Sequence, residues 1–98
     1  MTLQLPSSKI AQDIMVSLFG KEPMYIRKIS DEIDKNSSSV FAALETLQDL
    51  KYIEPVKDSR FPSNVTLFKL TEVGNEVTKE IKSMRREKEK HFSGPLFL

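Results

Sequence analysis

The residues that most often perform catalysis are scarce in this chain. It has no cysteine and a single histidine, His91, near the carboxyl end. No histidine accompanies a serine in the body of the chain, and no glycine-rich phosphate loop occurs. A zinc site of the usual cysteine and histidine kind cannot be assembled within one chain. We therefore expect no enzyme activity, no metal site and no cofactor.

Cationic side chains in the middle of the chain are suited to binding phosphate instead. Arg27 and Lys28 stand where a helix is predicted to begin, and cations in that position oppose the helix dipole. This unfavourable placement favours another role, such as phosphate contact. Arg60 lies among turn-forming residues with Lys57 nearby, and an arginine on a protruding hairpin can enter a narrow DNA minor groove. The alternative for Arg60 is an ordinary solvated loop cation.

Charge alone does not indicate nucleic-acid binding. The 98 residues carry a net charge of +1. Residues 1–75 hold nine lysines and arginines against ten acidic residues, and residues 76–98 hold six against four. Because a DNA-binding domain is commonly strongly basic, this balance slightly favours a neutral interaction module. No apolar run approaches the roughly 20 residues that span a bilayer, and no signal peptide is evident, so we expect a cytoplasmic protein with no membrane partner.

The hydrophobic pattern predicts a mainly α-helical domain with a small β-hairpin. Apolar residues at helical spacing and turn-forming residues between them place the elements. Asn36 is suited to a left-handed conformation, and Ser37 or Ser38 can cap the helix that follows. A short extended piece is expected at residues 24–26. Helices are expected at about 8–18, 26–34, 37–50 and 71–90, and strands at 52–57 and 65–70.

The chain divides into one domain with short flanking segments. Residues 1–7 look like a flexible lead-in, residues 8–75 form the domain, residues 76–91 continue as a C-terminal helix, and residues 92–98 are an apolar tail. Val77, Ile81 and Met84 form one stripe on that helix, which is either core or the seam of a dimer. Since the helix extends past a small body, we expect homodimerisation through it. The apolar tail either packs on the partner subunit or has no fixed structure.

Two stretches of the sequence resemble winged helix-turn-helix proteins. Residues 29–53 look like the second helix, the recognition helix and the entry to the wing. Residues 68–74 follow a Tyr-x-Leu-Thr-x-x-Gly pattern, with Phe68 in the aromatic place. The resemblance covers about residues 8–84. It is greatest to small MarR-like and PadR-like transcription regulators and to single-domain proteins of archaea and their viruses. It implies an α+β fold, a winged helix-turn-helix with an extended C-terminal helix.

The resemblance also implies a function and a set of contact residues. Such a protein would bind double-stranded DNA as a homodimer, with its third helix in the major groove and its hairpin on the adjacent backbone or minor groove. By position, the serines at the start of that helix would meet phosphates and the first bases. The implied DNA-binding residues are Arg27, Lys28, Ser37, Ser38, Ser39, Phe41, Ala42, Thr46, Lys57 and Arg60. The alternative is a winged-helix module that binds protein, with Phe41 as an apolar contact. Nothing in the sequence identifies an effector ligand.

Overall fold

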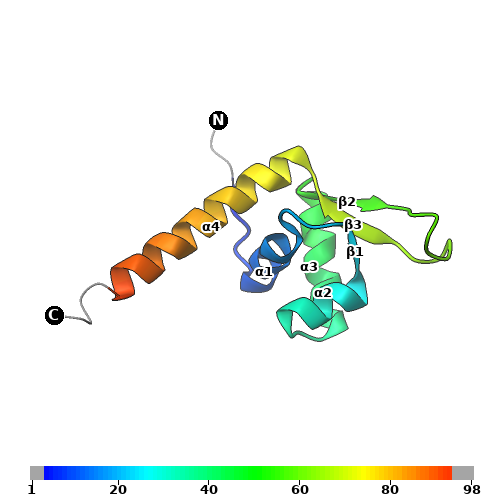
Figure 1. The fold of residues 1–98 in the computed structure, drawn as a ribbon, viewed down its shortest axis with the longest axis horizontal. Coiled ribbons are helices and arrows are strands. Elements are labelled where there is room, and N and C mark those ends of the chain that lie inside the picture. Colours follow the sequence, from blue (N-terminus) through cyan, green and yellow to red (C-terminus); the bar gives the residue numbers. More distant parts are fainter. Residues whose placement is uncertain (1–3, 94–98) are drawn as a thin grey trace.

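A computed structural model describes residues 4–93 of the chain, and the side chains of residues 4–85. Four helices and three strands follow one another in the expected order (Figure 1). The hairpin extends from one side of the helical body, and the last helix projects from the other (Figure 1). The elements are α1 (Lys9–Leu18), β1 (Met24–Tyr25), α2 (Ile26–Ile33), α3 (Ser37–Asp49), β2 (Ile53–Val56), β3 (Leu67–Leu70) and α4 (Glu72–Ser93).

Helix α1 is the centre of the core. It packs against α2, α3 and α4, and its residues Ile14 and Met15 are completely buried. From α3, the side chains of Val40, Leu44 and Leu47 face this centre and are essentially inaccessible to solvent. Because these apolar positions recur at helical spacing, each helix buries one stripe and exposes the rest. Helix α3 therefore presents its opposite face to solvent.

The three strands form an antiparallel sheet in the order β1-β3-β2. The short strand β1 pairs with β3, with Met24 opposite Phe68. Strand β2 pairs with the other edge of β3, with Ile53 opposite Leu70. Pro55 lies in β2 at the edge of the sheet, where its missing N–H group does not interrupt a ladder on its outer side. The expected extended piece before α2 and the expected hairpin are both confirmed.

The turn between α2 and α3 differs from the sequence expectation in its details. Asp34, at the end of α2, adopts the left-handed conformation with φ of 56°. Asn36 is extended and caps α3, because its side-chain Oδ1 accepts a hydrogen bond of 2.9 Å from the backbone N–H of Ser39. The prediction that Asn36 is left-handed and that a serine caps the helix is thus wrong. The serines occupy the first helical turn instead.

The junction between β3 and α4 is held by Thr71. Its hydroxyl accepts a hydrogen bond of 3.0 Å from the N–H of Gly74 and donates one of 2.7 Å to the carbonyl of Lys51. Its own N–H donates to the carbonyl of Tyr52. Helix α4 approaches this carbonyl so closely that a Cβ atom at Gly74 would lie 1.9 Å from the Tyr52 oxygen. This contact explains the Thr-x-x-Gly part of the pattern seen in the sequence.

The segment before α1 is packed on the domain. Leu5 contacts the core, and Pro6 is buried. The carbonyl of Pro6 accepts a hydrogen bond of 2.7 Å from Gln12, and the carbonyl of Gln4 accepts one from the hydroxyl of Tyr52. The expectation of a flexible lead-in is therefore wrong for residues 4–7. The first three residues lie outside the described part of the chain.

Helix α4 contributes to the core of its own subunit. Val77 and Ile81 are 0% and 2% exposed. This corrects the expectation that both lie on a dimer seam, because a side chain without exposed area cannot form a direct contact with a second copy. Met84 is 54% exposed, so its side chain can still contact a second copy of the chain. The expected tail at 92–98 falls mostly outside the described residues, although the α4 backbone continues to Ser93.

Polar side chains of α4 contact α1 and the residue that follows it. The guanidinium of Arg85 donates a hydrogen bond of 2.7 Å to the carboxylate of Asp13, forming an ion pair. The ammonium of Lys82 lies 4.8 Å from the centre of the Phe19 ring, within the range of a cation–π contact. Within the described residues, no helix is both long and apolar enough to cross a membrane.

Candidate nucleic-acid interface

The outward face of α3 brings together five of the ten residues that were assigned to DNA from the sequence. Ser37, Ser38, Phe41, Ala42 and Thr46 are all exposed, whereas Ser39 is half-buried. Phe41 is 53% exposed, so the structure decides between its two possible locations in favour of the surface. These residues come from three successive helical turns and form one surface. We call the exposed residues the α3 face, and it also includes Glu45 and Asp49.

The start of α3 is well suited to anion contact. The first N–H groups of a helix have no partner within it, and the helix dipole makes this end positive. The Asn36 side chain satisfies the N–H of Ser39. Ser37 and Ser38 lie before it in the first turn, and both are exposed. This end of α3 can therefore offer backbone N–H groups and two hydroxyls to a phosphate.

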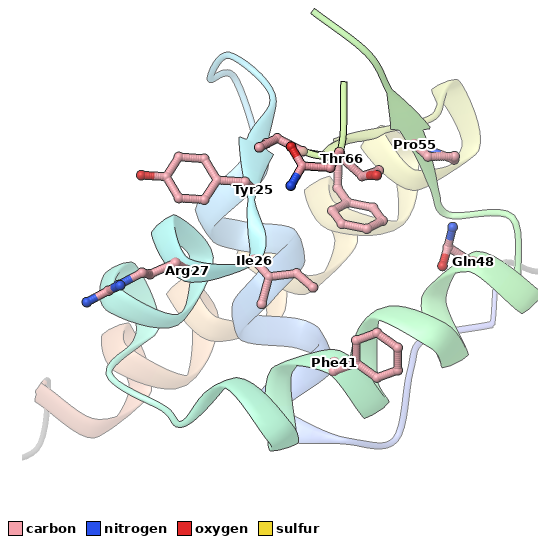
Figure 2. A pocket seen from close by; sticks show the side chains of 10 residues that line it. Tyr25, Ile26, Arg27, Phe41, Gln48, Pro55 and Thr66 are labelled. Carbon is pink, nitrogen blue, oxygen red and sulfur yellow. The ribbon is translucent and has the colours of Figure 1, made fainter. Parts of the chain in front are cut away.

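A shallow groove of about 370 Å³ runs between α3 and the β-hairpin (Figure 2). Phe41 borders it on the side of α3, with Ile26 beside it, and Thr66 and Pro55 border it on the side of the hairpin (Figure 2). A second hollow lies at the start of α3 and is lined by Ile26, Ser37, Ser38 and Phe41. The ring of Phe41 therefore stands between two hollows.

Arg27 and Lys28 are exposed in the first turn of α2. Arg27 also lines the groove, and Figure 2 shows its side chain extending beyond α2 on the side away from Phe41. Tyr25, two residues before Arg27, contacts the hairpin through Phe61, with 6.1 Å between the ring centres. Arg27 is thus placed beside the groove, and Lys28 follows it as an exposed cation on α2.

Arg60 is not an isolated loop cation. Its guanidinium binds both oxygens of Asp58, with a shortest distance of 2.7 Å, and its backbone N–H also donates to this carboxylate. These hydrogen bonds lower the pKa of Asp58 from 3.8 to about 2. The side chain of Arg60 is still 71% exposed. Sequence analysis gave it a free positive charge, whereas the structure gives it a charge that Asp58 neutralises.

Lys57 has a structural role in the hairpin. Its ammonium donates hydrogen bonds to the carbonyls of Ser63 and Val65 and to the hydroxyl of Thr66, at 2.9, 3.3 and 3.0 Å. The lysine therefore holds the two sides of the hairpin loop together. All three N–H donors of its ammonium already meet acceptors of the loop, so none is left for a phosphate in this conformation.

The Asp58–Arg60 pair gives a prediction that can be tested by titration. The depressed pKa means that the pair supports the loop above the ordinary carboxyl pKa of 3.8 and is lost as the pH falls toward 2. In an NMR titration, the Asp58 carboxyl should have its midpoint near 2, and in Arg60→Ala it should move back toward 3.8. An unchanged midpoint in the variant would show that other groups hold the carboxylate ionised.

One polar residue of the groove was not predicted from the sequence. Gln48 is half-buried and lines the groove, two helical turns after Phe41. The spacing of seven residues places both side chains on the same side of α3 and was the available signal. Among the residues that the structure describes, no group of three or more histidine or acidic side chains is arranged to hold a metal ion.

Known proteins share this architecture, although none was found through sequence. No protein-family model matches the chain, and no curated protein matches its sequence. Solved structures do match. ZitR from Lactococcus lactis has a TM-score of 0.79 at 22% identity over 94% of this chain and 60% of its own. The adhesin competence repressor AdcR from Streptococcus pyogenes has a TM-score of 0.80 at 18% identity, over 96% and 66%. A MarR-family transcriptional regulator from Silicibacter pomeroyi has 0.74 at 20%, over 89% and 58%.

The chain has a MarR-like winged-helix fold. At identities near 20%, this likeness establishes the architecture, and it confirms the fold expected from the sequence. In its terms, α2 and α3 form the helix-turn-helix, and β2 and β3 form the wing. The chain spans about 60% of the length of ZitR. These matched proteins come from bacteria, so the archaeal or viral origin suggested by the sequence stays a prediction.

Proposed function

We propose that this protein is a transcription regulator that binds double-stranded DNA. In this proposal α3 enters the major groove, and the wing follows the adjacent backbone or minor groove. The observation that carries the proposal is the α3 face. It is exposed along its length, its Phe41 borders the groove shared with the hairpin, and its first turn offers a positive helix end. The fold is also that of solved proteins described as a repressor and a transcriptional regulator.

Phosphate contacts would come from few groups. Arg27 and Lys28 are exposed on α2, with Arg27 lining the groove, and the start of α3 adds its N–H groups. Glu45 and Asp49 lie further along the α3 face and would repel phosphates. We therefore expect affinity to depend on the two α2 cations more than on the wing, where Arg60 is already paired with Asp58.

This expectation can be tested by measuring binding to the chain's own upstream region and to a random duplex at two salt concentrations. Because each phosphate contact releases counterions, affinity should fall steeply with salt. The slope of log affinity against log salt should be shallower by about 0.9 for each contact removed. We expect Arg27→Ala/Lys28→Ala to bind more weakly and with a reduced slope. Arg60→Ala should lower affinity by a smaller amount.

Lys79→Ala is the matched control for these variants, since Lys79 is an exposed cation on α4. It should bind DNA like the unmodified protein. If the affinity of the unmodified protein for DNA does not change with salt concentration, the phosphate mechanism is contradicted. Unaltered binding by Arg60→Ala would remove the wing arginine from it.

We further propose that the protein is a homodimer joined through α4. The support is a helix of 22 residues whose described surface includes exposed apolar side chains, Val73 at 47% and Met84 at 54%. Sedimentation velocity should detect a dimer, and Met84→Glu should shift it toward monomer. Ser83→Glu places the same charge at the neighbouring exposed position and should have a weaker effect. A monomer at all concentrations would contradict the proposal.

The second candidate function is a winged-helix module that binds protein. The exposed ring of Phe41 and the two carboxylates of the α3 face favour it, as does the nearly neutral charge of the chain. The same fold can serve assembly as well as DNA binding. The measurement at two salt concentrations distinguishes the candidates, because only the first predicts binding to a random duplex at low salt.

A further inference from the structure

The α3 face has an unusual composition for a surface that meets DNA bases. Few of its side chains can make directional hydrogen bonds to a base. The hydroxyl of Thr46 donates a hydrogen bond of 3.3 Å to the carbonyl of Ala42, one turn earlier in the helix. Glu45 and Asp49 can only accept hydrogen bonds when ionised. The serines of the first turn lie at the helix end that suits phosphate. The centre of the face is therefore apolar.

Phe41 is the largest side chain at that centre. The ring is 53% exposed, and the exposed methyl side chain of Ala42 follows it in sequence. Exposing a large aromatic ring is unfavourable in water, and such exposure often marks a contact surface. Hollows of about 370 and 390 Å³ flank the ring, and Ile26 lines both of them. The ring and its neighbours thus form a raised apolar feature with space on both sides.

The edges of the four bases differ in what they offer to such a feature. In the major groove, guanine, adenine and cytosine present hydrogen-bond donors and acceptors, whereas thymine adds a 5-methyl group. A phenyl ring cannot satisfy the donors and acceptors, and it leaves them without water when it covers them. It can bury a methyl group with a favourable change in free energy. Of the base edges, the thymine methyl is the partner that fits.

We propose that Phe41, assisted by Ala42, recognises thymine by its 5-methyl group in the major groove. This inference rests on the proposed DNA-binding function and deepens it by naming the chemical group that is read. Recognition of this kind is selective without directional hydrogen bonds, because it depends on whether one methyl group is buried against the ring.

The test uses a duplex enriched from a random library by the full chain. Each thymine of the enriched site is replaced in turn by deoxyuridine, which keeps the base pair and removes the methyl group. At one or more positions, we expect affinity to fall by about three- to fivefold, as for the loss of one buried methyl group. At such a position, a pair of 5-methylcytosine and guanine carries the same methyl group in the major groove. It should therefore recover part of the affinity that deoxyuridine loses.

Variants of Phe41 connect this effect to the ring. Phe41→Ala should bind more weakly and should bind thymine and deoxyuridine duplexes equally. Phe41→Leu keeps an apolar side chain and should retain part of the discrimination. Lys79→Ala changes an exposed side chain of α4 outside the α3 face and should leave the discrimination intact. Circular dichroism is the check that each variant is folded.

Two outcomes would overturn the inference in distinguishable ways. If the unmodified protein binds the duplex but does not distinguish thymine from deoxyuridine, or if Phe41→Ala distinguishes them equally well, methyl recognition by Phe41 is wrong and the DNA-binding function stands. If no duplex is bound at low salt, the inference and the proposed function both fail. The exposed ring then belongs to a protein-binding surface.

Discussion

Replacing Gly74 with alanine should destabilise the protein by about 3 kcal/mol, although alanine is ordinarily the better helix former. The reason is the close approach of α4 to the backbone of Tyr52. An added Cβ atom would lie 1.9 Å from the Tyr52 carbonyl oxygen, a distance that no side-chain rotation can relieve. The same oxygen accepts a hydrogen bond from the N–H of Thr71, so moving the helix away also disturbs the junction that follows the wing.

Thermal unfolding gives the measurement, and Gly20→Ala provides the control. Gly20 has a positive φ of 70° but open space around its Cα atom, so alanine there should cost only about 1 kcal/mol for its backbone conformation. For a domain of this size, we expect the midpoint to fall by roughly 15 °C for Gly74→Ala and about 5 °C for Gly20→Ala. A Gly74→Ala protein as stable as the original would show that α4 does not approach the backbone of Tyr52 so closely.

Replacing Leu47 with alanine should reduce the free energy of unfolding by about 2–5 kcal/mol. Leu47 lies on the inner side of α3 and has no exposed area. The substitution removes three carbon atoms from the core and leaves a cavity there, because close-packed neighbours relax only in part. Since α1 and α3 pack directly on one another, the loss affects the element that presents the α3 face.

Thr46→Ala is the control for this variant, because the neighbouring position is exposed and its hydroxyl bonds only to the carbonyl of Ala42 in the described structure. Urea unfolding should show a change within about 0.5 kcal/mol for Thr46→Ala. Equal effects of the two substitutions would contradict the orientation of α3, since that orientation is what distinguishes them.

The fold could be predicted from the sequence because each helix carries a single apolar stripe. Ile14 and Leu44 are typical members of these stripes, and both are buried where the spacing placed them. The pattern from Phe68 to Gly74 was equally informative. Its threonine and glycine meet the backbone of Lys51 and Tyr52, so the contact leaves a mark on the sequence.

The helix cap was not predictable from residue types alone. Asp34, Asn36 and the serines after them are all capable of capping a helix or of turning the chain. Which of them does so depends on where α2 must stop so that α3 can pack on α1. That choice is made by tertiary packing, and it assigned the cap to Asn36 and the left-handed turn to Asp34.

The charges of the wing and the exposure of α4 were also beyond the sequence pattern. From the sequence, Lys57 and Arg60 were expected to be free to bind phosphate. The loop conformation instead brings carbonyl acceptors to Lys57 and the Asp58 carboxylate to Arg60. The stripe of Val77 and Ile81 fits a core and a dimer seam equally well. Only the path of α4 across α1 decides that both are core.

Lys82 and Arg85 contact Phe19 and Asp13. Because α4 is long, a small change in its angle would displace its far end by a larger distance. A helix of 22 residues is about 33 Å long, so a tilt of only 5° at its start moves its far end by about 3 Å. If two copies meet along α4, the separation of their α3 helices depends on this angle and must match one DNA turn of about 34 Å. The Asp13–Arg85 ion pair would then help to fix the angle between α4 and α1. A group that loosened it would change which spacing of half-sites the dimer can span, without touching a single base contact.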